Sequence, residues 1–227
     1  MSIMLVFYEL ISYTLPGLVY LFVINQVLRL LHQPYIALGN VASLPHILLL
    51  TAIAFILGHL FDSFSIWVWY RIVYRKEKHP QQALDELLQR NNIHLRFAPE
   101  DWNILLGVIR SRKFELAQYI EKLALDSIFL RNISTSLLLL GLLQIAVIIR
   151  SWFSIYELLF GMGVFILSYI AVRRSLVFRR RFYKVIFEQG YVYGSSLPQV
   201  LGRIDDLNAN EKSGPVHISG DDETLIE

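Results

Sequence analysis

The stretch from Leu48 to Tyr70 restricts the possible folds more than any other part of this chain. Its first half is apolar enough to lie in lipid, and it continues through Trp67, Trp69 and Tyr70 into a run of basic residues. A membrane helix leaves the bilayer on its cytoplasmic side in this way, with aromatic rings at headgroup depth and positive charge beyond them. The sequence therefore predicts a membrane-spanning helix at about residues 47–70.

Three other runs have the same apolar character. Residues 5–31 contain Pro16 and Gly17, where we expect a kink in a single span. Residues 132–149 carry no charge, and residues 155–172 carry only Glu157. A helix rises about 1.5 Å per residue, so each run reaches across a core of about 30 Å, the last with help from its flanks. The chain is 55% hydrophobic and 18% charged, which agrees with an all-α, polytopic membrane protein of four transmembrane helices.

The distribution of Lys and Arg predicts how these spans are oriented. The loops between the paired spans carry only Arg29 and Arg150, whereas basic residues gather after the second and fourth spans. By the positive-inside rule, both termini are cytoplasmic in the inner membrane of a bacterium. The predicted order is a first transmembrane hairpin at 1–73, a cytoplasmic helical region at 74–131, a second hairpin at 132–172, a basic juxtamembrane helix and turn at 173–202, and a disordered acidic tail at 203–227.

Two helices are predicted in the cytoplasmic region. One runs from about Pro80 to Asn91, and the other begins at Pro99 and continues almost unbroken toward the third span. These segments contain few large apolar residues, so we expect them to pack on each other and on extensions of the membrane helices. The segment from Gly190 to Ser196 is interpreted as a turn, because it lacks the lysine of a phosphate-binding loop.

One group of polar residues inside the spans is a candidate site. His59 and Asp62 are three residues apart on one helix face, Ser63 is adjacent, and Glu9 lies in the first span. Because polar groups in lipid are costly, we expect this face to point toward other helices. The group either conducts protons or ions, or it is a hydrogen-bonded network that joins two spans. It supplies too few ligands for zinc, and we predict no metal and no cofactor.

The basic run after the fourth span is a candidate surface for lipid headgroups. Its cations are Arg173, Arg174, Arg179, Arg180, Arg181 and Lys184. A basic segment directly beside a span favours anionic lipid over nucleic acid, because each such residue contributes about 1 kcal/mol near the leaflet. We therefore predict membrane lipids, including anionic headgroups, as partners, and we consider nucleic acid an unlikely one.

Three short strings resemble a loose group of uncharacterised bacterial four-span proteins. They are Leu15-Pro16-Gly17, Ile56-Leu57-Gly58-His59-Leu60, and Asp126-Ser127-x-Phe129-x-Arg131-Asn132. Small multi-span proteins of this build often resemble membrane-acting effectors of phage defence. The resemblance implies a role in antiviral defence, and it assigns no functional residue.

These observations favour a protein that perturbs or monitors the inner membrane. We expect an oligomeric effector or sensor of the defence type that acts with a cytoplasmic protein partner. A small ion, proton or solute transporter that uses Glu9, His59 and Asp62 is the first alternative, and an intramembrane enzyme is the second. We predict that the protein is not an enzyme, because no nucleophile and base can be paired from the spans and cysteine is absent.

Overall fold

The computed structural model of the protein describes residues 3–34, 43–72, 79–91, 98–150 and 155–193, which form helices and no strand. Four of these helices are long and apolar enough to cross a membrane. They are α1 (Ile3–Leu30), α2 (Leu44–Ile72), α5 (Phe114–Arg150) and α6 (Ile155–Tyr193). Three short helices lie between α2 and α5 in sequence: α3 (His79–Asn91), η2 (Pro99–Asp101) and α4 (Trp102–Arg112). The predicted all-α, multi-pass architecture is confirmed, and the acidic tail at 203–227 lies outside the described residues.

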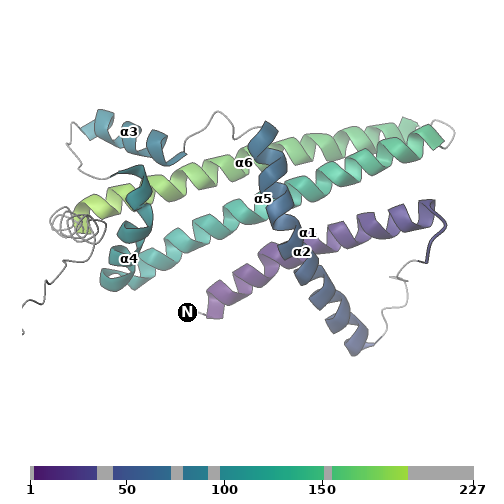
Figure 1. Ribbon diagram of the computed structural model, residues 1–227, viewed down its shortest axis with the longest axis horizontal. Helices are drawn as coiled ribbons and strands as arrows, with labels where there is room; N and C mark the ends of the chain where they lie inside the picture. Colours follow the sequence, from purple (N-terminus) through teal and green to yellow (C-terminus); the bar gives the residue numbers. More distant parts are fainter. Residues whose placement is uncertain (1–2, 35–42, 73–78, 92–97, 151–154, 194–227) are drawn as a thin grey trace, which may run out of the picture.

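The two longest helices, α5 and α6, form an antiparallel pair along the long axis of the molecule (Figure 1). They contain 37 and 39 residues, which is well over the 20 or so that cross a bilayer core. Both therefore extend far beyond the apolar runs at 132–149 and 155–172. The basic run continues α6 without a break, and so does the predicted turn as far as Tyr193. That part of the turn prediction is wrong, because residues 190–193 are helical. Gly190 packs there against the side chain of Leu105 in α4.

Helix α1 runs alongside α5 in the same direction. Near its start, the Tyr8 ring lies 4.7 Å from the ammonium group of Lys122, and further along Tyr20 contacts Asn132. The helix passes through Pro16 without interruption, as a single span requires.

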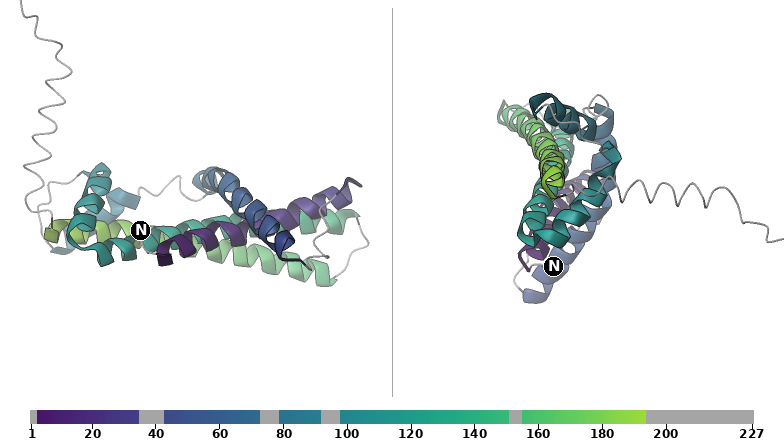
Figure 2. Two further views of the ribbon diagram at one scale, coloured as in Figure 1. Left: turned by 90° about the horizontal axis from the view of Figure 1, so that it is seen from below. Right: turned by 90° about the vertical axis from the view of Figure 1, so that its left-hand side faces the viewer.

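Helix α2 crosses the other long helices steeply (Figures 1 and 2). Two glycines allow the backbones of α1 and α2 to touch at this crossing. A Cβ atom at Gly17 would overlap the carbonyl oxygen of Ala54, and one at Gly58 would overlap that of Tyr13. Ala54 and Gly58 are four residues apart, so they share one face of α2. Small residues at this spacing are typical of close helix contacts in membranes.

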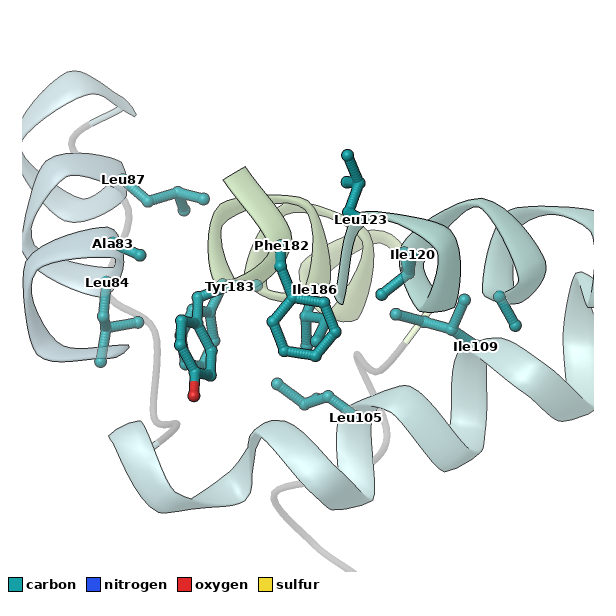
Figure 3. Packing of buried hydrophobic residues seen from close by; sticks show 12 residues of the cluster. Ala83, Leu84, Leu87, Leu105, Ile109, Ile120, Leu123, Phe182, Tyr183 and Ile186 are labelled. Carbon is teal, nitrogen blue, oxygen red and sulfur yellow. The ribbon is translucent and has the colours of Figure 1, made fainter. Parts of the chain in front are cut away.

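The short helices pack with the start of α5 and the end of α6 around one apolar core (Figure 3). We call this unit the head. Its buried residues come from four helices: Ala83, Leu84 and Leu87 of α3, Leu105 and Ile109 of α4, Ala117, Ile120 and Leu123 of α5, and Phe182, Tyr183, Ile186 and Phe187 of α6. The expectation that the helices of the 74–131 region pack on each other and on extensions of the long helices is confirmed.

The second cytoplasmic helix departs from its prediction in one respect. It begins at Pro99 as expected, with the Asp101 carboxylate accepting a hydrogen bond from the Ala98 N–H at 2.8 Å. It does not continue toward the third span, because Lys113 leaves helical geometry at φ −143° and ψ 82°. The break lets α4 fold back against α5, where Arg110 forms an ion pair with Glu121.

Candidate functional site: a polar layer between the membrane helices

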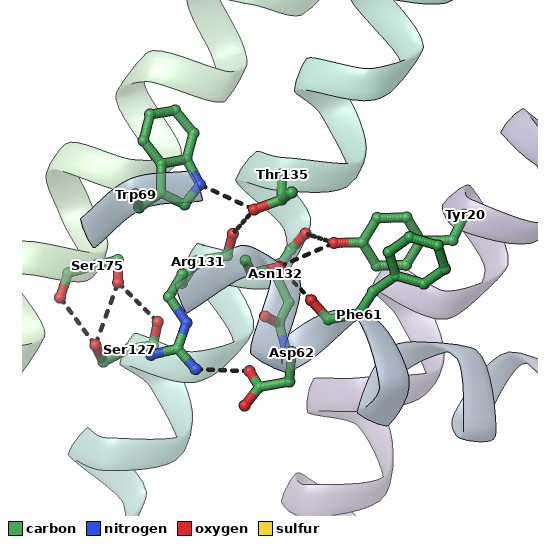
Figure 4. A network of polar contacts seen from close by, with 10 residues as sticks. Tyr20, Phe61, Asp62, Trp69, Ser127, Arg131, Asn132, Thr135 and Ser175 are labelled. Carbon is green, nitrogen blue, oxygen red and sulfur yellow. Dashed lines mark hydrogen bonds and ion pairs between the residues drawn. The ribbon is translucent and has the colours of Figure 1, made fainter. Parts of the chain in front are cut away.

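An ion pair joins α2 to α5 where α2 crosses the bundle (Figure 4). Nη2 of Arg131 donates to Oδ1 of Asp62 at 2.6 Å, and the two side chains are 4% and 21% exposed. A charge held away from water is costly unless it is paired. Each partner therefore offsets the free-energy cost of burying the other, and the pair fixes the position of α2 on α5.

Tyr20 ties α1 to the same place. Its hydroxyl lies 3.1 Å from Oγ of Ser65 in α2, and it donates to the backbone carbonyl of Asn132 in α5, also at 3.1 Å. Its ring stacks on Phe61 with 4.4 Å between centroids. The hydroxyl of this fully buried tyrosine thus connects three helices.

Trp69 completes the connection from α2 to α5 and α6. Its indole Nε1 donates to Oγ1 of Thr135 at 2.9 Å, and Thr135 donates to the backbone carbonyl of Arg131 at 3.1 Å. The ring packs with Val172 of α6 and is 6% exposed. Trp69 is therefore buried between helices, and the sequence interpretation that set its ring among lipid headgroups is corrected. We call the following set the polar layer: Tyr20, Asp62, Ser65, Trp69, Arg131, Asn132 and Thr135.

Two pairs of serines connect α5 with α6 next to this layer. Ser127 and Ser175 each donate to the backbone carbonyl of the other, at 3.1 and 2.7 Å. Ser134 and Ser168 do the same at 2.6 and 2.8 Å. A side chain reaches the opposite backbone at these lengths only if the two helices lie very close together. Small residues at a helix contact permit that approach.

The serine pairs belong to a seven-residue repeat on both helices. On α5 the series is Ser127, Ser134 and Gly141, and on α6 it is Gly161, Ser168 and Ser175. All six residues are buried. A strict seven-residue repeat keeps one seam of each helix facing its partner along their shared length. The seam therefore runs from the loop-connected ends of α5 and α6 toward the head.

Asn132 stands out within the polar layer because its side chain is fully buried and makes no hydrogen bond to any described residue. Both Oδ1 and Nδ2 lack a partner, and so does Nε of the adjacent Arg131. Unmade hydrogen bonds of buried polar groups are costly. The unpartnered groups of Asn132 and Arg131 therefore reduce the stability that the layer contributes.

Of the predicted group of Glu9, His59, Asp62 and Ser63, the first three lie around Tyr13 of α1, but they are not bonded to one another among the described residues. Asp62 faces Arg131, whereas His59 and Ser63 are exposed on α2 and Glu9 is half-buried on α1. His59 stacks on Tyr13 at 3.7 Å, and no hydrogen bond or ion pair joins it to Asp62 or Glu9 among the described residues. In the same part of the chain, no group of three or more His, Asp or Glu side chains is placed to hold a metal.

The predicted lipid-binding cations lie on α6, and most of them share a groove of about 790 Å³ beside α3. Arg173, Arg174, Arg180, Arg181 and Lys184 line it. Arg179 is on the same helix but is not among the lining residues.

Most of the polar layer was missed by the sequence analysis, although a signal for it exists. Ser127, Arg131, Ser134 and Thr135 follow one another at steps that keep them on one face of a helix. Dividing the chain between residues 131 and 132 separated Arg131 from this series. If α5 is taken as one helix, these residues form a polar stripe that enters the span, and such a stripe requires hydrogen-bonding partners on neighbouring helices.

Comparison with protein-family models, with curated proteins and with solved structures found no match for this chain.

Proposed function

We propose that the protein is a multi-pass sensor and effector of the bacterial inner membrane, whose head communicates with a cytoplasmic protein partner. The observation that carries this proposal is the continuity of α5 and α6 from the apolar spans into the head. A rigid helix pair transmits displacement at one end to the other. A change in the membrane would reach the head by this route, and a partner on the head would act on the spans.

The polar layer supplies the element that such coupling needs. It joins α1, α2 and α5 by directional contacts, and Asn132 has hydrogen-bonding groups for a second arrangement. Coupling between two sites requires an element whose equilibrium both sites influence. The layer lies between the outer spans and the head, where it meets that requirement.

The wider context is part of the same proposal. We place both termini and the head in the cytoplasm, in line with the clustering of Lys and Arg, and we expect a homo-oligomer. We further propose an effector role in antiviral defence and no enzymatic activity. Exposed apolar residues are abundant on the four long helices, as expected for surfaces that meet lipid or another subunit.

Orientation is tested with reporter fusions after Lys78, Ser151 and Arg181. We expect cytoplasmic signals at Lys78 and Arg181 and a periplasmic signal at Ser151. A periplasmic signal at either basic position would overturn the proposed topology.

Activity is tested by inducing the protein in bacteria and following growth and membrane potential with a dye, with and without phage. An effector should depolarise cells or slow growth on overproduction or infection. The matched variant Asp62→Asn weakens the ion pair while keeping the side-chain shape, and it should shift the dose that produces depolarisation. No change in potential, growth or infection under either condition would refute the effector role.

The transporter alternative is less well supported by the geometry. It requires Glu9, His59 and Asp62 to share one path, but Asp62 is paired with Arg131, and His59 stacks on Tyr13 with no hydrogen bond to either acid among the described residues. Amide variants of the three residues separate the two functions. Loss of solute-dependent activity in Glu9→Gln, His59→Gln and Asp62→Asn proteins that still fold would restore the transporter hypothesis.

A further inference from the structure

We propose that the groove between α6 and α3 binds the headgroup of one anionic phospholipid from the cytoplasmic leaflet. The inference deepens the proposed function, on whose membrane assignment it rests. It goes beyond general attraction between a basic segment and a charged membrane, because it assigns a bounded site with named walls. The groove has a volume of about 790 Å³, which is in the range of small-molecule sites.

The positive charge of the groove comes from one face of α6. Arg173, Arg180 and Lys184 recur at steps of seven and four residues, and Arg174 and Arg181 lie beside them. The two arginines at 173 and 181 are exposed, so their guanidinium groups are accessible to a ligand. Guanidinium groups bind phosphate through paired hydrogen bonds, which suits a phosphodiester.

The end of the groove toward the span is apolar. Tyr169 and Ile170 line it, and both are exposed on the membrane helix. A phospholipid has the same order of chemistry, with an anionic head joined to apolar chains. Free phosphate or nucleic acid would leave this apolar wall unused, so the amphipathic lining favours a lipid.

The opposite wall includes Glu86 of α3, which is exposed and belongs to the head. A lipid in the groove would therefore touch both the membrane helix and the head. Its binding would depend on how α3 sits against α6, and lipid occupancy would in turn hold α3 in place. The carboxylate also opposes an anion, so its removal should strengthen binding.

The experiment uses the full-length protein in detergent micelles, with lipid binding measured by native mass spectrometry and by the shift in melting temperature. The probes are phosphatidylglycerol, phosphatidylcholine, inorganic phosphate and a short single-stranded RNA. We expect saturable binding of phosphatidylglycerol with one lipid per chain, and much weaker binding of the other three. Equal binding of phosphatidylcholine, or tighter binding of phosphate or RNA, would overturn the proposal.

Matched variants separate a groove from a diffuse basic patch. Arg181→Gln removes a lining charge and should weaken phosphatidylglycerol binding about fivefold, the effect of one cation near a membrane surface. Arg179→Gln removes the same charge from the same helix at a position off the groove, and it should change binding less than twofold. Equal weakening by both variants would show a diffuse patch and refute the site.

The acidic wall gives an independent gain-of-affinity test. Glu86→Gln should strengthen phosphatidylglycerol binding several-fold, whereas Glu100→Gln, an exposed acid on η2, should leave it unchanged. Unchanged binding in the Glu86 variant would remove α3 from the site. All these readouts are made on purified protein, so their failure is distinct from a failure of the effector role in cells.

Discussion

Two parts of the same helix pair are held together by different kinds of side chain. In the head, α5 and α6 meet through large apolar residues such as Ile120 and Ile186, both fully buried. Closer to the apolar spans, the same helices meet through Ser127 and Ser175, and then through Ser134 and Ser168. This is the change in side chain expected where a helix pair passes from water into lipid.

The difference shows which force is available on each side of the membrane surface. In water, burial of apolar surface stabilises a contact by roughly 25 cal/mol per Å². In lipid that gain is absent, because lipid chains are as apolar as leucine, and helices associate through close packing and hydrogen bonds. The serine pairs, the glycines of the α1–α2 crossing and the polar layer are all contacts of this second kind.

Truncation of an apolar side chain should have its largest effect in the head. Phe187 is fully buried there, and Phe187→Ala should destabilise the head by about 3–5 kcal/mol. The matched change Phe7→Ala, at a position 63% exposed on α1, should have almost no effect. Hydrogen exchange of the detergent-solubilised protein should show loss of protection in α3, α4 and the parts of α5 and α6 that form the head. A comparable loss in α1 and α2 would contradict the division.

Removal of one partner of the ion pair should have the largest effect within the membrane part. Arg131→Met leaves the Asp62 carboxylate without its cation, at a cost of about 3 kcal/mol. Adding Asp62→Leu to that variant should restore much of the stability, because no charge is then left unpaired. Thermal unfolding in detergent measures both variants, with Arg112→Met on the exposed end of α4 as the control. Additive losses in the double variant would show that the pair is not coupled.

The glycine crossing should come next in size. Gly58→Ala places a methyl group on the backbone of Tyr13, so α1 and α2 must separate, at about 1–3 kcal/mol. Gly163→Ala is the control, because open space surrounds its Cβ position and alanine favours a helix by up to about 1 kcal/mol. Opposite signs in melting temperature are expected. Stabilisation by both substitutions would show that the crossing is looser than described.

The helices themselves could be predicted from the sequence because each depends on local chemistry. Long uncharged runs determine the spans, and Pro99 followed by acidic residues determines the start of the helix at 99–112. The continuity of α5 and α6 was harder to foresee. Composition placed domain boundaries near residues 131 and 173. The backbone hydrogen bonds of a helix form in lipid and in water alike, so α5 and α6 continue across both boundaries.

The polar layer could be predicted only in part, because its contacts join residues far apart in sequence. Asp62 was recognised as costly in lipid, yet its partner is 69 residues away on α5. His59 was grouped with it by spacing, but its ring stacks on Tyr13 of α1, whereas Asp62 pairs with Arg131 of α5. The lipid-groove cations were easier to find, since they are neighbours on a single helix.

The smallest expected effect tests how the serine seam works. Ser134→Ala removes one interhelical hydrogen bond but preserves the small volume, and such bonds in membrane proteins contribute about 0.6 kcal/mol on average. Ser136→Ala is the matched control, because that hydroxyl donates within α5 to Ile133 and reaches no other helix.

Ser134→Val separates the two roles of the serine. It removes the same hydrogen bond and also adds bulk where the helices are closest, so it should cost about 1–3 kcal/mol. If the small volume matters most, alanine will lie near the wild type in melting temperature and valine far below it. If the hydrogen bond matters most, both variants will lose stability equally. Because α5 and α6 run without a break from the apolar spans into the head, we expect the valine variant to uncouple depolarisation from events at the head as well.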